Sequence, residues 1–358
     1  MRTQGGFEGR RIQRTGGSTF IVSLPKTWAT SRGLRAGDLL LFSPGADGSL
    51  TIYTEETPRS ERHRRVVTVT NSLPKDHLFR QLVAEYIAGG PLLEIRTNGR
   101  MSARTREVIR EFAQRVIGPE ILEESGDAVI LQDVVGANPL PLTSVVRRMH
   151  HMVETMQTDA MAAFLHQDMA IAEDVRERDW EVDRLHWFVQ KQVTTALRDQ
   201  RALTALGLTF PECATFLLAS RVLERIADHA VRIAEVTELT KGSKLPPDSL
   251  AEFSRLSASA LEGLRAAVDT VYSGDTQRAN EVLDAMERLV AQRRKLLDEF
   301  LSRPGRVAVA LAYVLESLER TGLYASDLAE IAINHSVSTQ AMAATAPPAR
   351  AEPPAPTS

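Results

Sequence analysis

The chain of 358 residues contains one cysteine, Cys213, and few aromatic residues, 5% of the total. A single thiol excludes a disulfide framework and any zinc or iron–sulfur site built from several cysteines, and it suits a reducing compartment. No apolar run approaches the roughly 20 residues of a membrane-spanning helix, and the N-terminus lacks the apolar segment of a signal peptide. The charges nearly cancel, with 43 Lys and Arg against 46 Asp and Glu. We therefore expect a cytoplasmic protein without membrane insertion, and not a uniformly basic nucleic-acid coat.

The pattern of apolar residues divides the chain into segments. Residues 1–57 hold short β-rich runs separated by glycines, which are typical of strands and hairpins. Residues 58–141 alternate strand and helix patterns in the order β-α-β-α-β-β, which predicts a small α/β sandwich. From residue 142 to 335 the apolar residues follow the helical period. Residues 336–358 are rich in Ala, Pro, Ser and Thr, and we expect a disordered tail there.

The helical half of the chain contains an internal repeat. Two pairs of segments align, with offsets of 95 and 107 residues: 223–235 with 318–330, and 168–185 with 275–292. Breaks between helices are expected near residues 201–210, 241–247 and 303–306. The simplest interpretation is two tandem three-helix bundles, at residues 142–245 and 246–335.

Two pairs of carboxylates flank apolar stripes in the first copy of the repeat. Asp179 and Asp183 are four residues apart beside one stripe, and Glu224 and Asp228 are four apart beside another. Carboxylates at this spacing share a helix face and repel each other. If the two faces meet, four oxygen-donor groups converge, a set that suits hard cations, iron or manganese. With arginines nearby in sequence, the same acids also fit an ordinary solvated helix face, and spacing alone leaves both interpretations open.

The helix at residues 221–235 reads Arg-Val-Leu-Glu-Arg-Ile-Ala-Asp-His-Ala-Val-Arg-Ile-Ala-Glu, and Asp179 begins the pattern Asp-x-x-x-Asp-Arg-Leu. Both motifs resemble signatures of the phosphate uptake regulator family, PhoU. The resemblance covers roughly residues 143–335 and implies two tandem three-helix bundles that bind a cluster of divalent or trivalent metal, either iron, zinc or manganese. The ligands that it implies are Asp179, Asp183, Glu224 and Asp228.

The second copy departs from this pattern. A gapless alignment places Met286 and Val290 opposite the two aspartates of the first motif, and Leu323 opposite Asp228. A shift of three residues would restore one acid, Glu287. At most two of the four acids remain in either alignment, so we expect the second copy to be free of metal.

The N-terminal 65 residues carry 11 basic and 6 acidic side chains in a chain of net charge −3. Such a basic, β-rich unit fits either a reader of the nucleic-acid backbone or a solvated charged surface. Residues 11–28, with the segment 33–38, resemble the SpoVT/AbrB-type swapped-hairpin DNA-binding domain. The resemblance implies a swapped-hairpin β-barrel shared by a homodimer, which agrees with the thin core that so short a unit can form. The expected DNA contacts are Arg10, Arg11, Arg14 and Lys26.

The order of these parts resembles archaeal phosphate uptake regulators, and we expect a multi-domain, mainly α protein. The leading hypothesis is a phosphate-responsive regulator that binds DNA through its N-terminal domain and metal through its helical body. The alternative is an adaptor that does not bind DNA and that restrains a phosphate transporter or sensor kinase by protein contact. A metal-dependent hydrolase is a weaker third hypothesis, because the sequence shows no nucleophile–base–acid arrangement, and we expect no enzyme activity.

Overall fold

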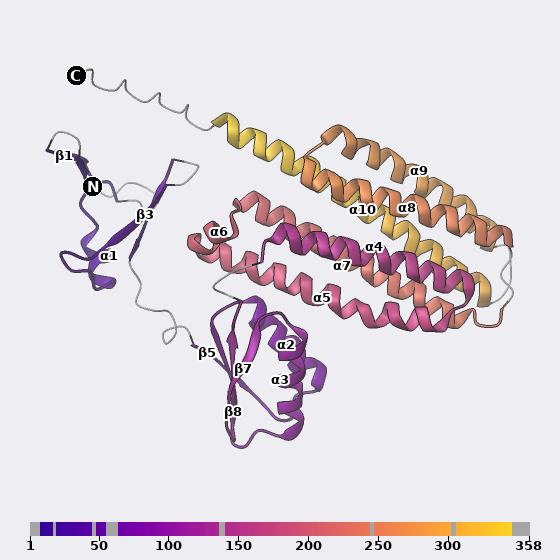
Figure 1. Cartoon of the computed structure of the whole chain (residues 1–358), viewed down its shortest axis with the longest axis horizontal. Helices are drawn as coiled ribbons and strands as arrows, with labels where there is room; N and C mark the ends of the chain where they lie inside the picture. Colours follow the sequence, from indigo (N-terminus) through magenta and orange to yellow (C-terminus); the bar gives the residue numbers. More distant parts are fainter. Residues whose placement is uncertain are drawn as a thin grey trace. The chain divides into compact units, whose positions relative to one another are not determined.

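The computed structural model describes residues 8–16, 19–44, 48–54, 64–135, 140–243, 247–301 and 306–345. The chain divides into two compact units, Met1–Arg59 with Thr345–Ser358, and Ser60–Ala344 (Figure 1). Each unit is described by itself. The described part is mainly helical, as the sequence predicts.

The N-terminal unit contains two antiparallel hairpins and one short helix. Strand β1 (Gln13–Thr15) pairs with β2 (Thr19–Ile21), and β3 (Leu40–Pro44) pairs with β4 (Leu50–Thr54). Helix α1 (Lys26–Ser31) follows Pro25, whose fixed backbone angle suits a helix start. The hairpins belong to two separate two-stranded sheets, so the described residues of this one chain form no closed barrel.

The second unit begins with a four-stranded sheet backed by two helices. Its elements follow the predicted β-α-β-α-β-β order: β5 (Arg64–Val69), α2 (Lys75–Ile87), β6 (Leu92–Thr97), α3 (Ala103–Arg115), β7 (Pro119–Glu124) and β8 (Ala128–Asp133). The strand order is β5-β6-β8-β7, with β5 parallel to β6 and the other pairs antiparallel. One face of the sheet packs on α2 and α3, where Leu82, Ile95, Ile109 and Phe112 are fully buried.

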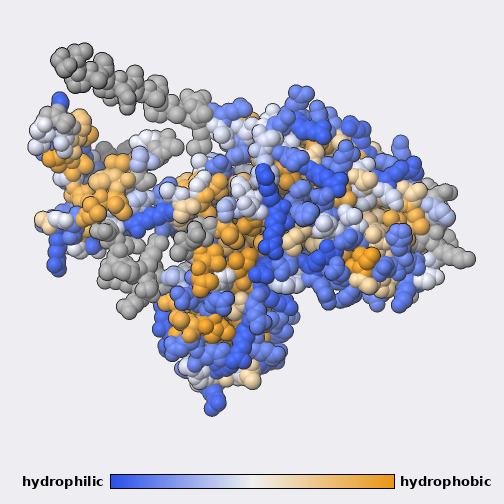
Figure 2. Space-filling model, in the orientation of Figure 1, coloured by the Kyte–Doolittle hydropathy of each residue, from blue (hydrophilic) through white to orange (hydrophobic). Residues whose placement is uncertain are grey.

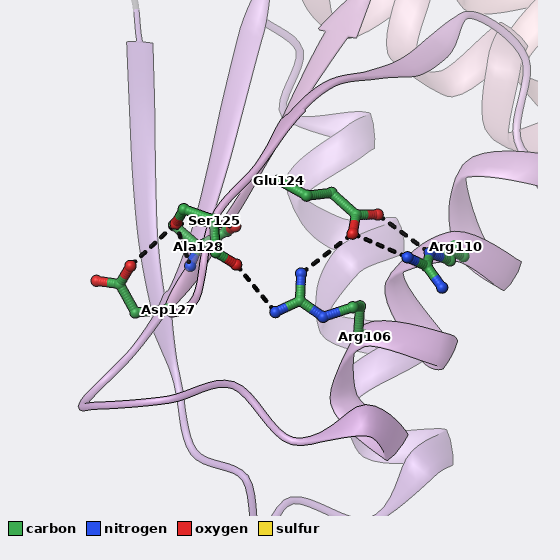
Figure 3. Close-up of polar contacts among 6 residues, drawn as sticks. All are labelled: Arg106, Arg110, Glu124, Ser125, Asp127 and Ala128. Carbon is green, nitrogen blue, oxygen red and sulfur yellow. Dashed lines mark hydrogen bonds and ion pairs between the residues drawn. The ribbon is translucent and has the colours of Figure 1, made fainter.

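The turn between β7 and β8 is fastened to α3 by polar contacts (Figure 3). Glu124 accepts hydrogen bonds from Arg110 at 2.8 and 3.0 Å and from Arg106 at 3.1 Å. Arg106 also donates to the carbonyl of Ser125 at 3.0 Å, and the Ser125 hydroxyl donates to Asp127 at 2.9 Å. Two arginines on one carboxylate fix the hairpin over the helix, because charge-assisted hydrogen bonds are directional and strong.

The described residues of the rest of this unit form seven helices. Six of them match the two predicted three-helix bundles, and a short seventh helix lies near residues 201–210, where a break was expected. The seven helices are α4 (Leu142–His166), α5 (Met169–Arg198), α6 (Gln200–Leu206), α7 (Phe210–Leu239), α8 (Pro247–Ser273), α9 (Thr276–Leu301) and α10 (Arg306–Thr345). Helices α4, α5 and α7 form the first bundle, and α8, α9 and α10 are their counterparts. Buried residues of both bundles belong to one apolar cluster. Gln157 of α4 also donates to the Ile226 carbonyl of α7 at 2.8 Å and to Thr321 of α10 at 3.2 Å.

Two helix breaks that the predicted three-helix bundles require were not located from the sequence. Helix α4 ends at Gln167, which has a left-handed φ of 53°. The Gln167 side chain offsets this strain, since it donates to the carbonyls of Thr240 and Ser243 at 3.0 and 2.8 Å and accepts from the Gly242 amide at 3.2 Å. The break between α8 and α9 lies at Gly274, with a φ of 67°, a conformation that favours glycine.

The expected disordered tail is wrong in its first ten residues. Helix α10 continues to Thr345, so residues 336–345 are helical. The segment before Pro347 is rich in alanine, a strong helix former, and proline is the first residue that would interrupt it. The rest of that segment, residues 346–358, lies outside the described residues.

No single helix of the described chain is long and apolar enough to cross a membrane; α6 and α7, bent by 71°, meet the length and composition limits only as a pair.

The α/β domain is docked on α5 through a buried ion pair. Lys191 Nζ lies 2.6 Å from Asp133 Oδ2 and 4.6 Å from the Tyr86 ring centre, and the Lys191 and Asp133 side chains are only 5% and 10% exposed. Burial lowers the pKa of Lys191 below its ordinary value, although Asp133 works in the opposite direction. Trp187 of α5 also contacts Phe79 of α2, with ring centres 6.1 Å apart.

Replacing Lys191 by Ala should therefore destabilise the protein by about 3–5 kcal/mol, because it leaves Asp133 buried without its counter-charge. The matched control is Lys75→Ala, which breaks an ion pair with Glu111 at the surface, 2.8 Å long, and should cost less than about 1 kcal/mol. Urea denaturation measures both. Equal losses in the two variants would contradict a structural role for the buried pair.

Candidate functional site

The apolar stripes of α5 and α7 pack against each other and bring the four predicted acids to one rim. The stripe residues are at most 3% exposed: Val175, Val182, Leu185, Val189, Leu223, Ile226, Ala227, Ala230 and Ile233. Asp179 and Asp183 on α5 and Glu224 on α7 are partly buried beside this contact, while Asp228 is exposed at its edge. The two helix faces, whose meeting the sequence left open, therefore lie together in the structure.

Each of the four carboxyl groups is perturbed by its neighbours. Burial, followed by the charges of Asp179, Glu224 and Asp228, raises the pKa of Asp183 to about 7. Burial, then the charge of Asp228, raises the pKa of Asp179 to about 6. The pKa values of Glu224 and Asp228 are also raised, first by shielding from water. The charge of at least one other acid of the group thus raises the pKa of Asp179, Asp183 and Glu224, so these acids are not isolated surface charges.

One atom of this group lacks a partner. Arg221 donates to Glu224 Oε1 at 3.0 Å, whereas Glu224 Oε2 is buried with no hydrogen-bond partner among the described residues. An unpaired buried carboxylate oxygen is costly, and a cation would satisfy it. The donor set therefore fits a hard metal ion in its chemistry. In this conformation, however, no three His, Cys, Asp or Glu side chains of the described chain converge closely enough to hold an ion.

His186 belongs to the same face and was missed from the sequence. It follows Asp183 by three residues, and its Nδ1 lies 3.0 Å from the Ser220 hydroxyl of α7. Its Nε2 is buried without a hydrogen-bond partner in the described chain. Burial and the charge of Arg221 lower the pKa of His186 to about 4, so the ring is neutral at neutral pH. The spacing Asp179-x-x-x-Asp183-x-x-His186 was the available signal, because positions i, i+4 and i+7 share one helix face.

The second copy fills the corresponding place with apolar atoms. Asp275 caps α9, accepting from the Arg278 amide at 2.9 Å, as Asp168 caps α5. The matching caps support the gapless alignment, which puts Met286 opposite Asp179. Met286 is 2% exposed.

Two glycines make room for Met286. A Cβ atom added at Gly263 would lie 2.4 Å from Met286 Cε, and one added at Gly322 would lie 3.3 Å from its Sδ. The one retained acid, Glu319, is paired with Arg293 at 3.2 Å. Arg293 occupies the position that His186 has in the first copy. An internal ion pair and a methionine thus replace the four-carboxylate rim.

The predicted DNA contacts lie at the surface of the N-terminal unit. Arg10, Arg11, Arg14 and Lys26 are exposed, and Arg10 is paired with Glu8. Arg14 lies on β1, and Lys26 begins α1. The structure thus leaves all four side chains accessible.

The same unit exposes its apolar side chains. None of its described residues, 8–16, 19–44 and 48–54, is buried. Phe20 is 71% exposed, Ile12 70% and Leu50 59%, and Figure 2 shows apolar side chains on the surface of this unit. Because the described residues of this unit form no buried core, we expect the unit to be unstable in isolation.

Comparison with known proteins agrees with both parts of the chain. The PhoU domain model matches residues 146–237, which contain all four acids. This region is a PhoU domain. Residues 13–61 match the model for the MazE bacterial antitoxin, of the antidote–toxin recognition type, so the N-terminal unit is of the MazE/AbrB type.

Two curated relatives of the chain are phosphate-specific transport system accessory protein PhoU homologues. The chain is 28% identical over 146 residues to that of Xylella fastidiosa strain Temecula1, covering 39% of this chain and 58% of the relative. It is 32% identical over 125 residues to that of Caulobacter vibrioides strain NA1000, covering 32% and 50%. The chain thus spans about half the length of the curated relatives it matches.

The crystal structure of PhoU from Pseudomonas aeruginosa has the same helical fold. It aligns with a TM-score of 0.51 at 22% identity, over 57% of this chain and 99% of that one. The helical part of this chain therefore has the architecture of two PhoU-type bundles.

The raised carboxyl pKa values predict how stability depends on pH. A carboxyl whose pKa is raised from 3.8 to about 7 in the folded state destabilises the fold as pH rises through that interval. In the presence of a chelator, Asp183→Asn should therefore be more stable than the parent at pH 8, by about 1–2 kcal/mol, and the difference should shrink towards pH 5.

Burial lowers the pKa of His186 and His229 to about 4, so these histidines make the fold more stable as pH rises, opposite to Asp183. Both histidines are present in the parent and in the variant, so comparing the stability of the two proteins at each pH removes their contribution. Glu177→Gln, an exposed acid on the same helix, is the control and should show no such trend. A pH-independent difference for Asp183→Asn would contradict the raised pKa of Asp183.

Proposed function

We propose that this protein is a phosphate-responsive regulator that binds DNA through its N-terminal unit and metal through its PhoU domain, and that it controls phosphate uptake from the cytoplasm. The observation that carries the proposal is the combination, in one chain, of a MazE/AbrB-type unit with a PhoU domain. The curated relatives bear names that refer to the phosphate-specific transport system. The role is regulatory rather than enzymatic.

The N-terminal unit supports DNA binding by its accessible basic residues and dimerisation by its exposed apolar ones. In a homodimer, Phe20 and Ile12 would be removed from water by the second copy, and the basic side chains of both protomers would lie on one assembly. Lys and Arg side chains bind DNA chiefly by neutralising phosphates and releasing counterions. DNA and a second copy of the chain are thus the proposed partners of this unit.

The PhoU domain would hold its metal at the rim of α5 and α7. Asp179, Asp183, Glu224 and Asp228 supply hard oxygen donors, which suit iron or manganese, with zinc as an alternative. A cluster of several cations would neutralise the four acids and offer a positive charge to an oxyanion such as phosphate. The chain's own part is to hold the acids together at the apolar contact and to place Arg221 beside them.

An adaptor that does not bind DNA is the second candidate. It is favoured by the relatives' names, which describe accessory proteins of a transport system. In that case the protein would contact a phosphate transporter or a sensor kinase, and its basic N-terminal unit would serve only assembly. The two candidates differ in whether the purified protein binds DNA in a salt-dependent way.

Replacing Arg11 and Arg14 by Ala should weaken DNA binding. It should also reduce the slope of the logarithm of the binding constant against the logarithm of the salt concentration by about one to two units, because fewer phosphates are neutralised and fewer counterions are released on binding. Filter binding or anisotropy at several salt concentrations measures the slope. Arg176→Ala with Arg255→Ala, two exposed arginines of the helical body, controls for net charge. No DNA binding by the parent protein would favour the adaptor.

Replacing Asp228 by Ala should remove most of the bound metal, whereas Glu319→Ala in the second copy should not change the metal content. Elemental analysis of both variants measures this. A metal that binds only the folded state raises stability by RT ln(1 + [L]/Kd), so Asp228→Ala should also abolish the rise in melting temperature on adding metal. Equal metal loss from the two variants would show that the second copy binds metal as well.

A further inference from the structure

The sheet of the α/β domain has two unlike faces. One packs on α2 and α3, on one side of the sheet in Figure 1. On the other face the outer strands carry exposed side chains: Arg64, Val66 and Thr68 on β5, and Glu120 and Glu123 on β7. Val66, an apolar residue, is 55% exposed.

The strand register shows how charge is arranged on this face. Val66 of β5, Glu94 of β6, Ile130 of β8 and Glu123 of β7 form one row across the four strands. Glu94 is 1% exposed and is paired with Arg64 and Arg96, which lie over it and are themselves exposed. The positive charges therefore lie on the β5–β6 half of the face, and the acids of β7 form the opposite edge.

A hollow of about 190 Å³ lies between these halves. Its lining includes Arg96 on one side, Ala128 and Ile130 at its base, and Glu123 and Asp127 on the acidic side. Ala128 and Ile130 are each 8% exposed. The hollow thus has an apolar floor and walls of opposite charge.

We propose that this face binds the same face of a second copy of the chain. The two-fold axis lies midway between the two stacked sheets, runs parallel to the strands and passes over the boundary between β6 and β8. Strand β5 of one protomer then lies over β7 of the other. Arg64 and Arg96 then meet the acidic edge of the partner, and the same contacts recur by symmetry. The two sheets lie about 10 Å apart, a distance at which side chains of the inner faces interdigitate.

The charge pattern favours a second copy over other partners. A face that is positive on one half and negative on the other is complementary to itself after a two-fold rotation, whereas a nucleic acid would be repelled by Glu120 and Glu123. The face measures roughly 20 Å along and 15 Å across the strands, less than a standard interface. The contact is therefore weak by itself and depends on ionic strength.

Site-specific crosslinking of the full chain tests this contact. Gln132 is exposed on β8 next to the proposed axis, so Gln132→Cys places two thiols near each other in the dimer, and a short bis-maleimide should join them. Glu107→Cys, exposed on α3 at the helical side of the domain, is the matched control and should give little crosslinked dimer. The native Cys213 is fully buried.

Charge reversal then tests the geometry. In the Gln132→Cys background, Glu120→Lys with Glu123→Lys should lower the crosslinking yield about tenfold, since the lost pairs are repeated by symmetry. Glu107→Lys with Glu177→Lys, the same charge change elsewhere on the surface, should leave the yield unchanged. Raising the salt concentration should lower the parent's yield.

Three results would overturn the proposal. One is an equal yield of crosslinked dimer from Gln132→Cys and Glu107→Cys. Another is a yield that does not respond to reversal of the β7 acids in a variant whose circular dichroism matches the parent. The third is monofunctional maleimide labelling of Gln132→Cys as fast as that of Glu107→Cys at the same protein concentration, because the face would then be open to solvent.

Discussion

The apolar contact between α5 and α7 is the constraint on which the candidate metal site depends. Burying two stripes of Val, Leu, Ile and Ala side chains forces the residues beside them to share one rim, whatever their charge. Asp183 and Glu224 are held there although the charge of Glu224 raises the pKa of Asp183, and the charges of Asp228 and Asp179 raise that of Glu224. The gain from apolar burial along two long helices exceeds this local repulsion. A costly arrangement of acids is therefore maintained by the packing beneath it.

The two bundles show what happens when that arrangement is lost. In the second copy Met286 packs into the space left by Gly263 and Gly322, and Glu319 has its own arginine. This half of the repeat is satisfied internally by apolar contact and one ion pair, while the first half retains an unpaired oxygen on Glu224. The two copies of the repeat thus share one fold but differ at this surface. The acidic surface of the first copy needs a counter-charge, and that of the second copy does not.

Core formation also separates the N-terminal unit from the rest of the chain. The α/β domain and the helical bundles each bury an apolar core. The ion pair between Lys191 of α5 and Asp133 of β8 joins the α/β domain to the first bundle. The N-terminal unit buries none of its described side chains. We therefore expect that this unit becomes stable only with a partner, so that its folding and its assembly are one process.

Local pattern alone determined most of the secondary structure. The periods of apolar residues predicted the β-α-β-α-β-β order and the long helices, because one buried face imposes its spacing on the sequence. The break at Gln167 was missed, since its left-handed turn is held by Thr240 and Ser243, more than seventy residues away. The end of α10 was placed ten residues too early, because a segment rich in Ala, Ser and Thr was interpreted by composition rather than by helix propensity.

For the candidate site, the sequence determined which residue types lie beside each stripe, and so it identified Asp179, Asp183, Glu224 and Asp228. Only the tertiary structure decided that the two rims meet, that His186 and Ser220 join them, and that Met286 fills the matching place in the second copy. The same holds for the sheet face with Arg64 on one edge and Glu123 on the other. The physical reason is that spacing along a helix or strand defines a face, whereas the partner of that face is chosen by packing between distant segments.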